Sequence, residues 1–288
     1  QLLHWHDRTF NMHEGGKIEV VSLAKVNDRH DLSMAYTPGV ARVCMAIHEN
    51  PALSHELTIR KNTVAVVTDG TAVLGLGDIG PAAAMPVMEG KALLFKEFAG
   101  VDAFPICLDV SDPQEIIDTV IRIAPTFGGI NLEDIAAPEC FEIERRLVEE
   151  LDIPVMHDDQ HGTAIISGAA LLNGLEVVEK NIEDVKVVVS GAGASALSCS
   201  EHWLLLGVRP ENMLLVDSKG IITEARRDAE DINEYKARFA RDVDDGDLAD
   251  AMKGTDVFLG LSVGGIVSGD MLRSMAPRPL VFALANPD

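Results

Sequence analysis

Two short acidic clusters in this chain could supply ligands for one divalent cation. Glu133 and Asp134 are adjacent, and Asp158 and Asp159 stand in the run HDDQHGTA at 157–164. Hard cations such as Mg²⁺ and Mn²⁺ prefer oxygen ligands in a roughly octahedral shell, and three carboxylates leave positions open for water or a chelating substrate. Paired acids are more often solvated loop charges or helix caps. The predicted positions of these acids on strands and helices distinguish that interpretation from a metal site.

Each acidic pair is predicted to follow a strand. The segment 130–134 has the pattern of a strand after the Gly128-Gly129 break, and 153–157 has the pattern of the next one. Ligands of open parallel sheets gather at the carboxyl ends of the strands, so we expect the two acidic pairs to face each other. The other elements predicted in this part are strands at 17–22, 62–68 and 104–109, and helices at 85–99, 113–123 and 138–151.

Two histidines flank the acidic residues and raise the alternative of a zinc site. His157 precedes the second acidic pair and His161 follows it. Because the neighbouring ligands are hard oxygens, we interpret both histidines as supporting or packing residues.

A second predicted unit carries a dinucleotide-binding pattern. A strand at 185–189 is followed by a glycine turn, a helix at 197–206, a strand at 213–216 and the acid Asp217. In this pattern the glycines let the backbone approach a pyrophosphate at a helix N-terminus, and the acid binds the ribose hydroxyls. The residues assigned to the cofactor are Gly191, Gly193, Ala194, Ser195, Ala196 and Asp217. A bare structural turn is the competing interpretation.

The loop at 75–80 also reads GxGxxG, but we do not assign it to a cofactor. Asp78 would place a negative charge beside a pyrophosphate, and Pro81 removes a backbone N–H where a helix should donate. We predict that this loop belongs to the architecture of the first domain.

Composition and patterning predict an α/β protein of two domains. The 288 residues are 47% hydrophobic and 24% charged, which suits a globular chain that is long enough for two cores. The boundary is predicted in the long helix that starts near residue 160. We therefore expect an N-terminal α/β substrate and metal domain at 1–160 and a Rossmann-type doubly wound nucleotide domain at 161–288.

The charge and the absence of certain segments exclude several classes of protein. A formal net charge of −22 disfavours nucleic acid and anionic membrane surfaces. No stretch of roughly 18 uncharged apolar residues and no signal-peptide pattern is present. Cys44, Cys107, Cys140 and Cys199 lack CxxC spacing and are predicted to be reduced, mostly buried thiols. We expect a cytoplasmic enzyme or binding protein.

Six separated motifs together are far more specific than any one of them. They are Tyr36-Thr-Pro-Gly-Val-Ala41, Asp69-Gly70 with Gly75-Leu-Gly-Asp78, Glu89-Gly-Lys91, Asn131-Leu-Glu-Asp134, Asp158-Asp-Gln-His-Gly-Thr-Ala164 and the glycine turn at 191–196. In this order they resemble the malic enzyme family, specifically its shorter microbial form, from about Lys17 to the last residue. The resemblance implies oxidative decarboxylation of L-malate to pyruvate and carbon dioxide, with NAD or NADP and Mg²⁺ or Mn²⁺.

The resemblance also implies residue roles. Lys91 becomes the general base and Tyr36 the general acid. Glu133, Asp134 and Asp159 become the metal ligands, Asp158 and Thr163 take supporting roles, and Asn286 binds the substrate. Without the resemblance, a lysine on a helix is usually solvent-exposed and a tyrosine beside a proline turn usually packs. The family further suggests a homo-oligomer, a dimer or higher, with Tyr36 reaching a neighbour's site.

The chain departs from the family pattern at two places. Larger forms carry a substrate-binding arginine shortly before the Gly-Leu-Gly-Asp loop, where this chain has Thr71-Ala72-Val73. The family also continues beyond Asp288, so we expect the nucleotide domain to be incomplete. The choice between NAD and NADP stays open, because Asp217 favours a free ribose hydroxyl while Lys219, Arg226 and Arg227 could meet a 2′-phosphate.

Three alternatives remain at this point. A malolactic-type lyase would use the same metal and cofactor but release lactate. A different amino-acid or hydroxy-acid dehydrogenase would not need the three acids. A non-catalytic nucleotide-binding sensor would bind cofactor and tolerate the loss of Lys91.

Overall fold

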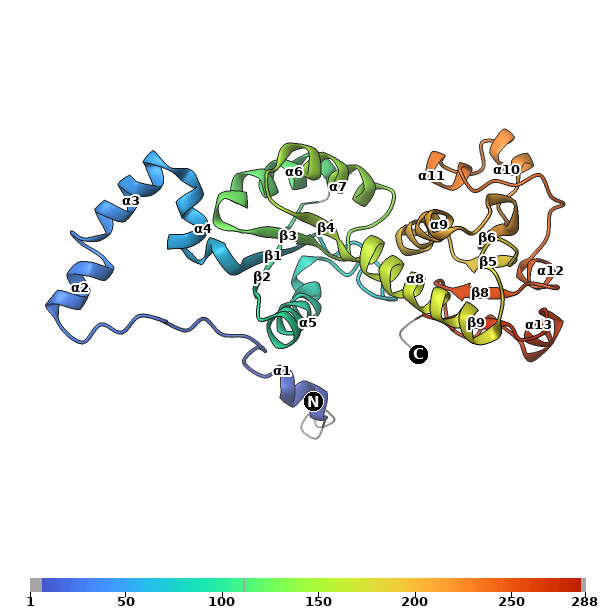
Figure 1. Ribbon diagram of the computed structural model, residues 1–288, viewed down its shortest axis with the longest axis horizontal. Coiled ribbons are helices and arrows are strands. Elements are labelled where there is room, and N and C mark those ends of the chain that lie inside the picture. Colours follow the sequence, from blue (N-terminus) through green and yellow to red (C-terminus); the bar gives the residue numbers. More distant parts are fainter. Residues whose placement is uncertain (1–6, 111, 286–288) are drawn as a thin grey trace. The chain divides into compact units, whose positions relative to one another are not determined.

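The chain forms two compact α/β units in the computed structural model (Figure 1), which describes residues 7–110 and 112–285. The first unit comprises Gln1–Thr71, Ile79–Glu133 and Ile143–Met156, and the second comprises Ala72–Asp78, Asp134–Glu142 and His157–Asp288. The predicted α/β class is confirmed. Asn286, the predicted substrate-binding residue, lies outside the described residues.

The first unit is built on a four-stranded sheet. Its strand order is β2-β1-β3-β4, with β1 parallel to both β2 and β3. The strands are β1 (Thr63–Thr68), β2 (Asp102–Cys107), β3 (Gly129–Leu132) and β4 (Val155–His157). Because Val67 lies opposite Leu132 at the ends of their strands, the chain leaves β3 for Glu133 at the carboxyl edge of the sheet, as the sequence predicts.

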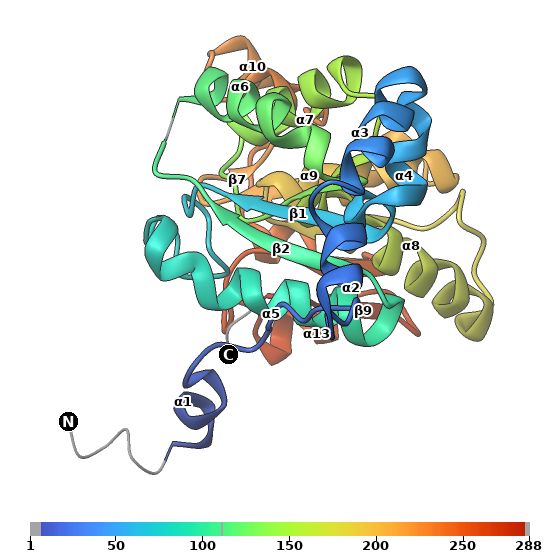
Figure 2. The ribbon, with the colours of Figure 1, turned by 90° about the vertical axis from the view of Figure 1, so that its left-hand side faces the viewer.

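Helices cover both faces of this sheet, with α5 (Pro81–Ala99) on one face and α6 (Pro113–Ile123) and α7 (Glu139–Glu150) on the other (Figures 1 and 2). Helix α5 buries Ala84, Met88 and Ala92, which recur every fourth residue. It begins at Pro81, earlier than the predicted start at residue 85, because proline suits the first position of a helix. The burial of Ala92 fixes the position of its neighbour Lys91.

Residues 7–62 contribute four helices that bury no residue. These are α1 (Arg8–His13), α2 (Arg29–Ala35), α3 (Val40–Glu49) and α4 (Ser54–Leu57). The strand predicted at 17–22 is wrong, because this segment contains neither helix nor strand. Val20 and Val21 are 86% and 63% exposed, and no neighbouring strand supplies the hydrogen bonds that would make a strand of them.

The second unit holds a five-stranded sheet in the order β7-β6-β5-β8-β9, parallel except for β7. The strands are β5 (Val187–Ser190), β6 (Met213–Asp217), β7 (Gly220–Ile221), β8 (Val257–Gly260) and β9 (Leu280–Ala283). The chain runs outward from β5 in one direction through β6 and then returns to the other side of β5 as β8. This reversal is the doubly wound arrangement predicted from the sequence, and the direction of winding changes between β5 and β8.

Two hydrophobic cores cover the two faces of this sheet. Val187 and Val189 pack with α8 (Asp158–Val178) and α9 (Ala194–Leu206), where Trp203 is fully buried. Val188 points the other way and packs near α12 (Leu248–Ala251) and α13 (Gly269–Ser274). The alternation of side chains along a buried parallel strand therefore accounts for both layers. Two short helices, α10 (Glu224–Asp228) and α11 (Glu234–Ala237), complete the unit.

The four cysteines are free thiols, as predicted. Cys140 and Cys199 are buried, Cys107 is half-buried and Cys44 is exposed. Within 7–110 and 112–285, no helix is long and apolar enough to cross a membrane.

Candidate functional site

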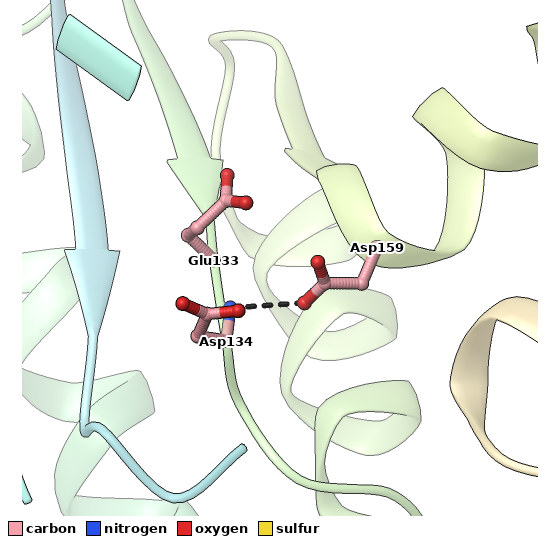
Figure 3. A group of neighbouring side chains, drawn as sticks. All are labelled: Glu133, Asp134 and Asp159. Atoms are coloured by element: carbon pink, nitrogen blue, oxygen red, sulfur yellow. Dashed lines mark hydrogen bonds between the residues drawn. The ribbon is translucent and has the colours of Figure 1, made fainter. Parts of the chain in front are cut away.

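Three of the predicted acidic residues converge. Glu133 and Asp134 follow β3 and are buried, and Asp159 lies in the first turn of α8. Each residue offers one carboxylate oxygen, and these oxygens lie within 4.8 Å of one another (Figure 3). The backbone N–H of Asp134 donates to Asp159 Oδ2 at 2.9 Å. Asp134 has a φ of +53°, a left-handed conformation that is uncommon for a residue with a side chain and that recurs at functional sites.

The donor set fits a hard divalent cation. Two of the three carboxylates are buried, and like charges held together in a low dielectric repel each other unless a proton or a cation offsets them. All three donors are carboxylate oxygens, the ligand type of Mg²⁺ and Mn²⁺. In the described part of the chain this is the one group of three or more His, Cys, Asp or Glu ligand atoms in such an arrangement.

Each oxygen of Glu133 has its own partner within the first unit. Lys91 Nζ, on α5, lies 3.2 Å from Oε1. Asn131 Nδ2, on β3, donates to Oε2 at 2.9 Å, while the buried Asn131 Oδ1 has no hydrogen-bond partner among the described residues. The sequence motif does not single out Asn131 from its neighbours. Its spacing from Glu133 does connect the two residues, because residues i and i+2 of an extended chain share one face.

Three predicted supporting residues lie near Asp159 in the sequence, at the end of β4 and on α8. His157 is fully buried, with Nε2 3.5 Å from Asp159 Oδ2, which agrees with the interpretation of His157 as a supporting residue. Asp158 and Thr163 are half-buried on α8. Their supporting roles stay predictions.

Tyr36 is not brought to the carboxylates. It forms the C-cap of α2 and is 67% exposed. Within the described residues its hydroxyl makes no hydrogen bond to Lys91, Glu133 or Asp134. Its role as general acid therefore stays a prediction.

The segment that leads into the GxGxxG loop at 75–80 contacts Asp134. The Ala72 N–H donates to the Asp134 carbonyl oxygen at 3.0 Å, and the Leu74 N–H lies 3.4 Å from Asp134 Oδ1. The loop closes because Gly70 has a φ of +75° and packs against the Gly80 backbone. These contacts agree with an architectural role for the loop.

The second glycine turn has the features of a pyrophosphate site. Gly191 has a φ of +124°, and a Cβ there would lie 3.3 Å from the Leu261 carbonyl group. Gly193 is the N-cap of α9 without a side-chain cap, and a Cβ added to Gly193 would meet nothing within 4 Å. The N-cap side chain therefore does not occupy the first N–H groups of α9, which are the groups that bind anions at a helix N-terminus.

The side chains of this turn contact other parts of the protein. The Ser195 hydroxyl donates to the Asp159 carbonyl oxygen at 2.7 Å, and Ala196 is buried against the core. The cofactor role of Ala194 and Ser195 stays a prediction, and it would depend on their backbone N–H groups. The Ser195 hydrogen bond also joins the first turn of α9 to the first turn of α8.

Asp217 ends β6 inside a network of cations. Arg226 binds both of its oxygens, at 2.9 and 3.0 Å, and Lys236 binds Oδ2 at 3.1 Å. Burial alone would raise the pKa of Asp217, but hydrogen bonds from Arg226, the Lys219 N–H and Lys236 outweigh it and lower the pKa to about 2. Asp217 is therefore an ionised carboxylate at neutral pH. The sequence offered Arg226 as a candidate ligand of a 2′-phosphate, but in the structure its guanidinium is paired with Asp217.

Two family models match consecutive parts of the chain. The malic enzyme N-terminal domain matches residues 15–148, and the malic enzyme NAD binding domain matches residues 160–288. The NAD-dependent malic enzyme of Geobacillus stearothermophilus is 58% identical over all of this chain, and the NADP-dependent malic enzyme of Escherichia coli is 52% identical over 95% of it. The chain spans 60% and 36% of the lengths of these two relatives.

A solved structure is similar over both units. The NAD-dependent malic enzyme of Thermotoga maritima superposes with a TM-score of 0.92 at 50% identity, covering 98% of this chain and 76% of that protein.

Proposed function

This chain belongs to the malic enzyme family, and from that premise we propose that it catalyses the metal-dependent oxidative decarboxylation of L-malate to pyruvate and carbon dioxide with NAD or NADP. The observation that carries this proposal is the convergence of carboxylate oxygens from Glu133, Asp134 and Asp159. A hydroxy-acid dehydrogenase that only transfers hydride would not need these three acids. A reaction that also releases carbon dioxide gains from a cation at this place, because the cation would stabilise the enolate that forms.

The three carboxylates would hold Mg²⁺ or Mn²⁺, which when bound polarises the substrate oxygens and stabilises the negative charge that develops during decarboxylation. Three protein ligands leave coordination positions for a chelating 2-hydroxy acid. Asp158, Thr163 and His157 support the loop and helix turn that carry the ligands.

Lys91 and Tyr36 are proposed to move the protons. Lys91 would take the proton of the C2 hydroxyl as malate is oxidised to oxaloacetate, and a bound nicotinamide would supply the hydride acceptor. Loss of carbon dioxide then leaves an enolate, and Tyr36 donates a proton to C3 to give pyruvate. The 3.2 Å contact with Glu133 places the Lys91 amine beside a proposed metal ligand, and so beside the oxygens of a substrate that this metal would hold. Asn286 is proposed to bind a malate oxygen.

The glycine turn and Asp217 are proposed to bind the dinucleotide. The pyrophosphate would accept hydrogen bonds from the first turn of α9, and the adenosine ribose would lie near Asp217. The Ser195 hydrogen bond to the Asp159 carbonyl supports this arrangement, since it ties the pyrophosphate turn to the helix turn of a metal ligand.

We also propose that the protein is a cytoplasmic homo-oligomer. Helices α1–α4 bury no residue, and large apolar side chains are exposed along this part of the chain. They include Phe10, Met12, Val20, Val21, Leu23, Leu32, Met34, Met45 and Ile59. Apolar exposure on this scale is typical of an interaction surface. A second copy that covers it would also bring Tyr36 to a partner.

An assay of reduced nicotinamide tests the proposed reaction. The full chain is mixed with L-malate, Mn²⁺ and either NAD or NADP, with and without chelator, while pyruvate and lactate are measured. We expect chelator-sensitive reduction of the cofactor with matching pyruvate. Lactate without net reduction would instead identify a malolactic-type lyase, and cofactor binding without turnover would identify a binding protein.

A further inference from the structure

Gln160, in the first turn of α8, carries a buried amide group whose nitrogen has no partner. The residue is 5% exposed, and its Nε2 makes no hydrogen bond to any part of the chain that the structure describes. Burial removes the hydrogen bonds of such a donor to water, and this loss is unfavourable unless an acceptor replaces them. Because buried side-chain donors are nearly always paired in proteins, Gln160 indicates an acceptor from outside the described residues.

Gln160 lies on the face of α8 that packs against α9. It begins a buried stripe that continues at helical spacing through Ala164 and Leu171. These two residues belong to a hydrophobic core that also contains Ala196 and Trp203 of α9. The side chain of Gln160 is therefore directed towards α9.

Helices α8 and α9 begin at the same end of the second unit. The Ser195 hydroxyl of α9 donates to the Asp159 carbonyl oxygen in the first turn of α8. Farther along α8, a Cβ added to Gly168 would lie 2.8 Å from the His202 ring of α9, so the two helices run in the same direction. Side chains on a helix lean towards its N-terminus. The Gln160 amide therefore leans towards the first turn of α9 and the glycine turn that precedes it.

Gln160 and Asp159 are neighbours in the sequence, but their side chains extend in different directions. Successive side chains on a helix are rotated by about 100°. The Asp159 carboxylate accepts a hydrogen bond from the Asp134 N–H at 2.9 Å, whereas Gln160 belongs to the stripe that faces α9. The acceptor of the Gln160 amide therefore belongs at the start of α9 and not among the three carboxylates.

We propose that Gln160 donates a hydrogen bond from Nε2 to the pyrophosphate of the cofactor, an inference that rests on the proposed dinucleotide site. A pyrophosphate is rich in acceptor oxygens, and at the first turn of α9 it would lie at the end of the helix pair towards which the amide leans. Gln160 would then add a side-chain donor to the backbone N–H groups of α9. It comes from α8, outside the glycine-rich motif, so the motif alone does not identify it.

Removal of the donor from a side chain of similar length tests this inference. The probe is ADP-ribose, which has the pyrophosphate but no nicotinamide, and its dissociation constant is measured by isothermal titration calorimetry for the full chain and for Gln160→Met. We expect the dissociation constant to rise by about 10–100-fold, the effect of a lost hydrogen bond to a charged group. Gln160→Glu should weaken binding further, because its carboxylate would repel the pyrophosphate.

Thermal unfolding separates ligand binding from a structural role. Because the Gln160 Nε2 gives up no hydrogen bond within the described residues, Gln160→Met should leave the Tm of the cofactor-free chain unchanged or raise it. The rise in Tm caused by a fixed concentration of ADP-ribose should be smaller in Gln160→Met than in the parent chain. A lower Tm without ligand, at unchanged affinity for ADP-ribose, would assign Gln160 to the stability of the fold and overturn the inference.

Controls separate the role of Gln160 from the proposed function. Asn173→Met removes an exposed amide of the same helix that donates to the Ala169 carbonyl oxygen, and it should leave the affinity for ADP-ribose unchanged. Weaker binding of Mn²⁺ in Gln160→Met, with ADP-ribose unaffected, would place the amide at the carboxylates and overturn the inference. Weaker binding of NADH alone would place it at the nicotinamide, with the same consequence. Failure of the parent chain to bind ADP-ribose would overturn the dinucleotide site and this inference together.

Discussion

Glu133, a proposed metal ligand, contacts Lys91, the proposed base. Its two oxygens are held separately, one by Lys91 on α5 and the other by Asn131 on β3. The carboxylate is therefore oriented before any cation binds. Orientation of this kind lowers the cost of assembling a site, because fewer side-chain rotations have to be lost on binding.

Substitution of Lys91 tests its assignment as the base. In Lys91→Ala we expect turnover with malate to fall by about 10²–10⁴-fold, the usual contribution of a general base, while NADH binding is retained. Steady-state kinetics and fluorescence titration measure the two quantities. Lys96→Ala is the matched control, because Lys96 lies on the same helix and pairs with Asp102 at the surface. Unchanged turnover in Lys91→Ala would contradict the assignment.

Asn131 is expected to act through Glu133. Asn131→Ala removes the hydrogen bond to Oε2, and the freed carboxylate should weaken Mn²⁺ binding by about 10–100-fold, as for other groups that orient metal ligands. Electron paramagnetic resonance of free Mn²⁺ measures the affinity without turnover. Asn62→Ala is a control, since Asn62 hydrogen-bonds to Asp102 at the surface. Equal Mn²⁺ affinity in the parent chain and Asn131→Ala would show that Asn131 does not orient the ligand.

Among the elements, the loop between β1 and α5 depends on one glycine. Gly70 and Gly77 both have positive φ, but a Cβ on Gly70 would lie 2.4 Å from the Gly80 backbone, whereas a Cβ on Gly77 would meet nothing within 4 Å. Alanine at Gly77 would therefore introduce backbone strain alone, whereas alanine at Gly70 would introduce both strain and a steric clash.

Alanine at these two glycines should give different losses of stability. Gly77→Ala should reduce the free energy of unfolding by about 1 kcal/mol through strain alone. Gly70→Ala should cost about 2–4 kcal/mol, because strain and displacement of backbone add. Equilibrium urea unfolding measures both values. Equal losses would show that the loop shifts freely to admit the Cβ.

The network around Asp217 joins β6 to α10 and α11 and should make their stability depend on pH. Its pKa is lowered from 3.8 to about 2 in the folded chain, so the ionised form stabilises the fold above the unfolded pKa. This contribution is lost as the pH falls through about 2. The stability difference between the parent chain and Asp217→Asn should therefore shrink between pH 5 and pH 2, as measured by urea unfolding. Asp228→Asn, at an exposed ion pair with Arg227, should show a much smaller difference at every pH.

For the molecule as a whole, the exposed apolar side chains of residues 7–62 predict self-association. Analytical ultracentrifugation of the parent chain should show an oligomer, and Val21→Asp combined with Leu23→Asp should shift it towards monomer, because charges would be buried at the contact. Both residues lie in a segment without helix or strand, so the fold should tolerate them. Val177→Asp, at an exposed position on α8, is the control. A parent chain that sediments as a monomer would contradict the proposal.

Local patterns in the chain were enough to predict most of the fold. Buried strands such as β1 and β5 are short apolar runs between turns, and α6 starts at Pro113 and ends at Ile123 as predicted. The two acidic pairs and the glycine turn could be placed at the carboxyl ends of strands because parallel sheets present all those ends at one edge. These features depend on residues close together along the chain.

The remaining features depend on residues that are far apart in the sequence and become neighbours only on folding. Whether 17–22 forms a strand depends on a partner strand, and none lies beside it. The pairing of Lys91 with Glu133 requires α5, which packs on β1 and β2, to bring its lysine to the residue that follows β3. The saturation of Asp217 requires α10 and α11 to bring Arg226 and Lys236 to the same carboxylate. Residue types and spacing thus indicate which groups can react. The packing of helices on sheets decides which of these groups already has a partner, because a side chain's partners are set by contacts across the fold.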